Sequence, residues 1–273
     1  MSSSSLFQQA EVLPVRLMVA LPALDEAATI AQVVTAIPRE IPGVSEILIL
    51  VVDDGSTDDT GILAEQAGAF VIRHVRCTGV GAAFRTALNH ALEQDIDILL
   101  TIDSDGQFDP GDIPELAQPV ISGECDFSSA SRFKDPSLMP KMPWIKRWGN
   151  RQMSRLISRL TQQQFYDVSC GMRCYNRRAM LNLNLMGAYT YTQEVFLNLA
   201  FKRLRIIEVP ISVRGVREHG KSRVVSSVGG YGFRALRIIM AAYRDYNPLR
   251  FFGSMAIALF VPAMFLAMFL AVH

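Results

Sequence analysis

The stretch Thr101-Ile102-Asp103-Ser104-Asp105-Gly106-Gln107 decides the fold, because two carboxylates follow directly on an apolar run. Residues 96–102 are mostly apolar, and such a run is typical of a buried strand. Asp103 and Asp105 then stand where the strand opens into a loop, and alternation along an extended chain points both the same way. Two oxygen ligands on one side suit a hard divalent ion that also binds phosphate. The alternative is a solvated acidic turn, in which Asp is common.

Two further apolar runs end in the same manner. Residues 46–52 run into Asp53 and Asp54, and residues 17–21 run into Pro22-Ala23-Leu24-Asp25-Glu26. Strands that each end in a carboxylate-bearing loop predict an open α/β sheet whose ligand site lies at its carboxyl edge. Carboxylates at that edge can accept hydrogen bonds from a base or from ribose hydroxyls. Helix capping is the alternative for residues 56–58, but it does not explain the two aspartates before them.

Two motifs taken together resemble a known family. Residues 51–58 read Val-Val-Asp-Asp-Gly-Ser-Thr-Asp, and residues 103–110 read Asp-Ser-Asp-Gly-Gln-Phe-Asp-Pro. This pair is similar to the inverting family 2 glycosyltransferases, and more narrowly to the dolichol-phosphate mannose synthase group, which uses polyprenyl phosphates. The resemblance covers about residues 15–250. It implies a GT-A fold, a Rossmann-like mixed sheet flanked by helices.

The resemblance also implies roles for individual residues. A divalent metal, Mg²⁺ or Mn²⁺, would be held by Asp103, Asp105 and Gln107. Arg132 and Arg147 would hold the acceptor phosphate and, with Asp105, form the catalytic set. The nucleotide-sugar would contact Pro22, Ala23, Asp25, Glu26, Val51, Asp53, Asp54, Asp103 and Ser104, with Arg217 and Arg223 clamping its diphosphate from a loop.

Several positions depart from the family pattern. Asp25 stands where Asn is usual beside Glu26, and Cys77 stands in a Gly-rich turn where a polar or basic residue is more usual. Residues 167–173 match an Asp-x-x-Ser-Gly-Phe-Arg pattern imperfectly, because Cys170 replaces Ser and Met172 replaces Phe. We expect Asp167 to shape the site and the cysteine to fill the core.

Composition narrows the function classes. The 273 residues suit one α/β domain with an attachment, and the formal charge of +1 argues against nucleic acid as an electrostatic partner. The four cysteines form no Cys-x-x-Cys pair, which favours a reduced compartment over a disulfide framework. The four histidines lack metal-ligand spacing, so a zinc site is not expected.

The C-terminal region predicts attachment to a lipid bilayer. Residues 251–272 carry no charge over 22 positions, which is long enough to span a membrane. Arg244 and Arg250 precede this run and nothing basic follows it, so the catalytic domain is expected on the cytosolic side of the cell membrane. The predicted organisation is a disordered segment 1–14, a catalytic domain 15–224, a juxtamembrane amphipathic helix 225–250 and a transmembrane helix 251–272. The alternatives are a buried core helix for the span and an ordinary surface helix before it.

The expected function is metal-dependent, inverting transfer of a hexose from a UDP- or GDP-sugar to polyprenyl or dolichyl phosphate. A processive polysaccharide synthase is an alternative, although it would need more spans and a Gln-x-x-Arg-Trp motif, and Arg147-Trp148 lacks the Gln. A non-catalytic nucleotide-sugar-binding membrane protein is another. The sequence leaves open the sugar, the lipid length, a homo-oligomer, and whether a second span follows.

Overall fold

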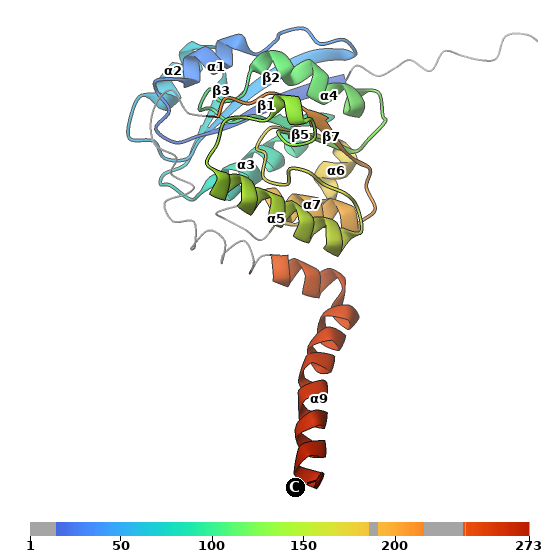
Figure 1. The fold of residues 1–273 in the computed structure, drawn as a ribbon. Helices are drawn as coiled ribbons and strands as arrows, with labels where there is room; N and C mark the ends of the chain where they lie inside the picture. The colour runs from blue at the N-terminus through green and yellow to red at the C-terminus, as the bar shows by residue number, and fades with distance from the viewer. Residues whose placement is uncertain (1–14, 186–190, 216–236, 238, 273) are drawn as a thin grey trace, which may run out of the picture.

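A seven-stranded mixed sheet forms the centre of the molecule (Figure 1). The computed structural model describes residues 15–185, 191–215, 237 and 239–272. The strands lie in the order β3-β2-β1-β4-β6-β5-β7. Their bounds are β1 Val15–Ala23, β2 Val44–Asp53, β3 Phe70–Arg73, β4 Ile98–Thr101, β5 Phe127–Ser131, β6 Arg173–Asn176 and β7 Ile206–Pro210.

Strand direction determines where the loops gather. β1 is parallel to both β2 and β4, and β2 is parallel to β3. β6 runs antiparallel between β4 and β5, whereas β7 is parallel to β5. The carboxyl ends of β1, β2, β3 and β4 therefore meet at one edge, which is the usual ligand edge of an open α/β sheet. This arrangement confirms the predicted mixed sheet flanked by helices.

Helices cover both faces of the sheet because alternate strand residues point to opposite sides. Leu17, Val19 and Leu21 pack with α1, α2 and α4 on one face, and Met18 and Ala20 pack with α3, α5, α6 and α7 on the other. The helices are α1 Ile30–Ala36, α2 Thr60–Gln66, α3 Val80–Glu93, α4 Ile113–Ile121, α5 Trp144–Thr161, α6 Arg177–Asn182 and α7 Thr192–Phe201, with short 3₁₀ turns at Pro110–Asp112 and Pro136–Leu138.

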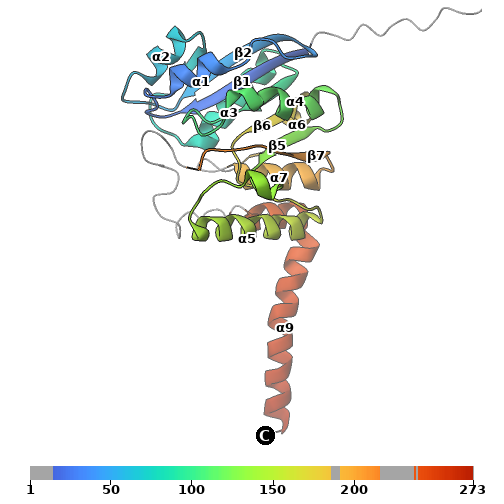
Figure 2. The same cartoon turned by 45° about the horizontal axis from the view of Figure 1, so that its top comes forward.

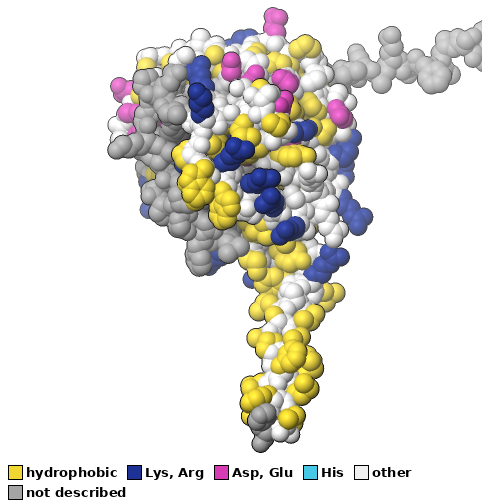
Figure 3. Space-filling model, viewed as in Figure 1, with side chains coloured by type: hydrophobic (Ala, Val, Ile, Leu, Met, Phe, Trp, Pro, Cys, Tyr) yellow, Lys and Arg dark blue, Asp and Glu magenta, His cyan; other side chains and the backbone are white. Residues whose placement is uncertain are grey.

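A long apolar helix, α9 Pro248–Val272, leaves the domain on the side of α5 (Figure 2). Its 25 residues are about 37 Å long at 1.5 Å per residue, against a bilayer hydrocarbon core of about 30 Å. None of its residues is buried, and hydrophobic side chains cover it (Figure 3). Among the described residues, it is the single helix whose length and composition would let it cross a membrane. It begins three residues before the predicted span.

The segment before α9 packs on the α/β domain. Residues 239–246 are helical, and Ile239 and Ala242 are buried in the same core as α7. Tyr246 donates a hydrogen bond of 2.8 Å to Asn198 of α7. Residues 239–246 belong to the segment 225–250, which we expected to form an interfacial amphipathic helix. In this part of it, the apolar face contacts the domain. Residues 1–14 and 225–236, predicted to be disordered and amphipathic, lie outside the described residues.

Candidate active site

The predicted nucleotide-sugar residues gather at the carboxyl edge of β1, β2 and β4. Ala23 and Asp53 are register partners at the ends of β1 and β2. The Asp54 amide donates a 2.8 Å hydrogen bond to the Ala23 carbonyl, and the Ser104 hydroxyl donates a 2.9 Å bond to the Pro22 carbonyl. Three loops that are distant in sequence are thus joined into one surface.

Asp25 and Glu26 tie the first loop to the second. The Asp25 carboxylate accepts a 2.7 Å hydrogen bond from the Thr57 amide, and the Asp25 amide donates a 2.9 Å bond to the Ser56 hydroxyl. The Glu26 amide donates a 2.8 Å bond to the Thr60 hydroxyl. The hydroxyls of Ser56 and Thr57, for which helix capping was the alternative, therefore join the two loops through hydrogen bonds to Asp25.

Asp53 is fully buried at the end of β2. One of its oxygens, Oδ1, accepts a 2.8 Å hydrogen bond from the Ser56 amide. The other, Oδ2, accepts no hydrogen bond and lies 3.3 Å from Nε of Arg73, whose side chain is more than half exposed. Because the carboxylate has no exposed surface, a base cannot reach Oδ2 unless the residues that cover it move. Val51 is also fully buried, and its side chain belongs to the core.

Asp54 holds the Gly-rich turn before α3. Its Oδ1 accepts 2.9 and 2.6 Å hydrogen bonds from the amide and hydroxyl of Thr78, and its Oδ2 accepts a 2.8 Å bond from the Gly79 amide. Burial raises the pKa of Asp54, but the bonds from Thr78 and His74 outweigh burial and leave the pKa below its ordinary value. Gly55 has φ +81°, and a Cβ there would lie 2.7 Å from the Arg76 carbonyl carbon, so the two loops meet backbone to backbone.

Asp103, Asp105 and Gln107 follow β4, as expected. Asp105 is 4% exposed and accepts a 3.0 Å hydrogen bond from the Gln107 amide. The side-chain nitrogen of Gln107 donates to the Arg214 carbonyl at 2.9 Å, so its amide oxygen remains the atom able to face a cation. Asp103 lies against Gly171, where a Cβ would come within 2.5 Å of its carboxylate oxygen.

This set of oxygens fits a hard divalent cation, although it is incomplete by itself. Within the described residues, no group of three or more His, Cys, Asp or Glu side chains is placed to hold a metal. Mg²⁺ is commonly bound by one or two carboxylates together with waters and substrate phosphates. Two carboxylates and an amide oxygen at the carboxyl edge of the sheet meet that requirement if a bound phosphate and water supply the remaining ligands.

Arg132 is fixed at the end of β5 by a buried carboxylate. Its Nε and Nη2 donate to Asp167 at 2.6 and 2.9 Å, and its backbone amide donates to the same carboxylate at 3.1 Å. Burial lowers the pKa of Arg132, but the charge and hydrogen bonds of Asp167 outweigh burial, with a smaller contribution from Asp103. The net effect is a pKa above the ordinary value. The guanidinium therefore stays charged.

A second buried acid supports this pair. The Glu208 carboxylate on β7 accepts hydrogen bonds of 2.8 and 2.7 Å from the amides of Tyr166 and Asp167. Burial raises the pKa of Glu208 above its ordinary value. We did not predict Glu208 from the sequence, although it is the lone carboxylate in the otherwise apolar strand Ile206–Pro210.

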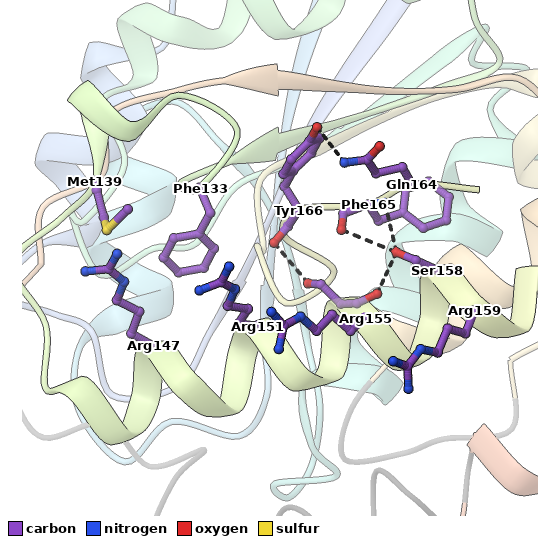
Figure 4. Close-up of a pocket in the computed structure, with 11 residues that line it drawn as sticks. Phe133, Met139, Arg147, Arg151, Arg155, Ser158, Arg159, Gln164, Phe165 and Tyr166 are labelled. Atoms are coloured by element: carbon purple, nitrogen blue, oxygen red, sulfur yellow. Dashed lines mark hydrogen bonds between the residues drawn. The ribbon is translucent and has the colours of Figure 1, made fainter. Parts of the chain in front are cut away.

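Arg147 projects from α5. It lines a cavity of about 550 Å³ between α5 and the segments that carry Phe133 and Tyr166 (Figure 4). Arg132 immediately precedes Phe133 and its guanidinium lies 5.3 Å from the centre of that ring, and Phe133 lines the same cavity as Arg147. Arg217 and Arg223 lie outside the described residues.

Three of the four cysteines are packed in the core, as expected for Cys170. Cys125, Cys170 and Cys174 are buried and unbridged, and burial raises the pKa of Cys170 to about 12. Cys77 is exposed, and its thiol lies 3.3 Å from Asp54. Arg173 is fully buried and donates to the carbonyls of Cys170, Thr192 and Val168, which stiffens the backbone around Asp167.

Known proteins share this architecture and these motifs. The family model described as glycosyl transferase family 2 matches residues 18–183. A UDP-N-acetylglucosamine–dolichyl-phosphate N-acetylglucosaminyltransferase of Methanococcus voltae is 30% identical over 60% of this chain and 73% of its own length. A polyprenol monophosphomannose synthase of Mycolicibacterium smegmatis is 25% identical over 78% of this chain and 82% of its own.

Solved structures show the same fold. Glucosyl-3-phosphoglycerate synthase of Mycobacterium tuberculosis, crystallised with Mn²⁺, UDP-glucose and phosphoglyceric acid, superposes with a TM-score of 0.64 at 24% identity. The match covers 84% of this chain and 80% of that one, and it identifies the sheet as GT-A-like. Since the family model spans β1 to α6 and includes both acidic loops, this chain belongs to glycosyl transferase family 2.

Proposed function

We propose that this glycosyltransferase transfers a hexose from a UDP- or GDP-sugar to polyprenyl or dolichyl phosphate with inversion at the anomeric carbon. Relatives named for dolichyl-phosphate and polyprenol substrates support the lipid acceptor. The observation that carries the proposal is the arrangement of Arg132. This arginine is fixed by Asp167 and lies over the ring of Phe133, which lines the same cavity as Arg147, so one predicted acceptor arginine is held beside the cavity that contains the other.

The acceptor chemistry needs no strong general base. A phosphate monoester has a second pKa of about 6 and is largely dianionic at neutral pH. Its oxygen can therefore attack the anomeric carbon directly, provided that its charge is held in position. Arg132 and Arg147 would bind and orient that phosphate, since arginine can grip it through two hydrogen bonds.

The donor would lie along the joined loops. Pro22, Ala23, Asp25, Glu26, Asp53, Asp54 and Ser104 line or hold this edge, and we propose that Arg217 and Arg223 contact the diphosphate. Arg214, three residues before Arg217, is hydrogen-bonded to Gln107 in both directions, so the chain lies at this edge at Arg214. Asp103, Asp105 and Gln107 would hold a Mg²⁺ or Mn²⁺ ion. That ion would supply positive charge against the leaving diphosphate.

We further propose that α9 spans the cell membrane and that the catalytic domain faces the cytosol. The helix is long enough to cross the hydrocarbon core, and its apolar surface is unburied. Arg244 and Arg250 stand at its domain end, which supports the cytosolic orientation. A lipid acceptor would then be presented on the same side as α5.

Lipid-dependent release of nucleotide tests the function. The full chain in detergent would be incubated with a short polyprenyl phosphate, a panel of UDP- and GDP-hexoses, and Mg²⁺ or Mn²⁺. We expect UDP or GDP release that requires the lipid. Asp105→Ala should lower the rate about 100-fold or more, because charge stabilisation of several kcal/mol is lost.

Asp109→Ala provides a matched control in the same loop. Asp109 is exposed, and its carboxylate accepts a hydrogen bond from the nearby Gly111 amide. This variant should keep near-normal transfer. Equal rates for Asp105→Ala and the wild type would contradict the metal assignment, and nucleotide release that is indifferent to the lipid would contradict the acceptor.

A further inference from the structure

Four arginines form a ladder along α5. Arg147, Arg151, Arg155 and Arg159 recur every fourth residue and cover about 18 Å of helix at 1.5 Å per residue. All four are exposed and line the cavity beside α5, and their side chains project from one side of the helix (Figure 4). Only Arg147 has a place in the proposed reaction, so the other three need a separate explanation.

The ladder lacks counter-charges of its own. The sequence of α5 contains Lys146 and these four arginines but no Asp or Glu. Among the described residues, none of the four guanidinium groups has a hydrogen bond or ion pair. Like charges four residues apart destabilise a helix, so an uncompensated ladder favours binding to an external anionic surface.

Both tryptophans of the chain stand on the same helix. Trp144 is 76% exposed and Trp148 is 56% exposed, which is unusual for such large apolar side chains. At roughly 100° per residue, both point in the same general direction as Arg151 and Arg155, whereas the buried Ile157 points to the opposite side. Tryptophan is enriched where a membrane meets water, because its ring is apolar and its N–H is polar.

The position of α5 matches this composition. α5 and α7 share a core with residues 239–242, and Tyr246 is hydrogen-bonded to α7 just before α9 begins. α5 therefore lies on the side of the domain from which α9 leaves, and it crosses the direction of α9 (Figure 2). A row of Lys and Arg side chains runs over α5, with hydrophobic side chains beside it and the apolar α9 below (Figure 3).

We propose that α5 docks the catalytic domain on the bilayer by binding the phosphate headgroups of anionic phospholipids. Arg151, Arg155 and Arg159 bind the headgroups, and Trp144 and Trp148 enter the interface. The proposal rests on the membrane attachment proposed for α9, but not on the sugar, the metal or the transfer reaction. Basic residues beside a span attract anionic lipid over about a Debye length, so docking holds the cavity beside α5 close to the membrane.

Because both tryptophans of the chain are on α5, tryptophan fluorescence, excited at a wavelength where the seven tyrosines do not absorb, reports on α5 alone. The full chain would be reconstituted into nanodiscs of neutral phosphatidylcholine, with or without phosphatidylglycerol, containing lipids brominated near the headgroup. We expect stronger quenching in the anionic discs and loss of the difference at high salt. Arg155→Gln with Arg159→Gln should lower the docked-to-undocked ratio about 30-fold, from two lost basic contacts with the surface.

The control variant is Arg39→Gln with Arg178→Gln. It removes two exposed arginines that lie outside α5, and it changes the net charge by the same amount. This variant should quench like the wild type. Equal quenching in neutral and anionic discs, or wild-type quenching by the Arg155 and Arg159 variant, would overturn the proposal. So would quenching in neutral discs that rises only when polyprenyl phosphate is added, because the ladder would then belong to the acceptor. A chain that docks normally but transfers no sugar would refute the proposed function and leave the docking surface intact.

Discussion

Replacing Asp167 with Asn removes the charge that holds Arg132 while keeping the size of the side chain. Arg132 donates three hydrogen bonds to this carboxylate, at 2.6, 2.9 and 3.1 Å. An Asn amide offers one acceptor oxygen and turns an NH₂ group toward a donor-only guanidinium. The substitution therefore leaves a largely buried positive charge without its partner.

The cost follows from burial. The Asp167 side chain has no exposed surface and that of Arg132 is 18% exposed. Removing one partner of a buried ion pair costs about 3–5 kcal/mol, and we take about 3 kcal/mol because water still reaches part of Arg132. At about 2–4 °C per kcal/mol for a domain of this size, the melting temperature should fall by about 6–12 °C.

A surface pair provides the control. Asp95 bonds Arg177 at 3.0 Å, but their side chains are 82% and 41% exposed. Such pairs contribute about 0–1 kcal/mol, and Asn tolerates the positive φ of Asp95, so Asp95→Asn should shift melting by about 4 °C at most. Thermal unfolding of both variants in the same detergent measures the difference. If Asp167→Asn melted like Asp95→Asn, Arg132 would not depend on this carboxylate.

Three further predictions concern the same site. Glu208 has a raised pKa in the folded protein, so its stabilising contribution is present below the ordinary pKa of 4.5 and is lost as pH rises through the folded pKa. From about pH 4 to pH 7, the melting temperature of Glu208→Gln should therefore rise progressively relative to that of the wild type. Asp54 has a lowered pKa, so its contribution is present above 3.8 and is lost as pH falls through the folded value; Asp54→Asn should cost about 2 kcal/mol at pH 7, and the gap to wild type should close in acid. Gly171→Ala would place a Cβ 2.5 Å from a carboxylate oxygen of Asp103 and should weaken Mn²⁺ binding, measured by calorimetry, while unfolding changes by about 1 kcal/mol or less; unchanged Mn²⁺ affinity would separate Asp103 from the metal.

The sheet and the position of its acidic edge could be predicted because they follow from local rules. Apolar runs that end in Asp53 and Asp103 become parallel strands, and parallel strands bring their carboxyl ends together. The α5 ladder is also visible in the sequence as arginine at every fourth position. These features depend only on spacing and residue type.

The supporting contacts could not be predicted in the same way. Glu208 reaches the amides of Tyr166 and Asp167 across about 40 residues, and no local pattern links them. Asp54 resembles a ligand-binding carboxylate, yet its oxygens hold the turn at Thr78 and Gly79. The sequence shows that a carboxylate is present at such a position. Only the tertiary structure shows which groups donate hydrogen bonds to it.

Mass spectrometry of the lipid product tests the central claim most directly. Purified full chain would be incubated with polyprenyl phosphate, a divalent metal and the nucleotide-sugar whose release depends on the lipid. We expect a polyprenyl phosphate that carries one hexose, and proton NMR of the same product should show the anomeric carbon inverted relative to the donor. Free hexose alone, or a growing series of hexoses on one acceptor, would contradict it.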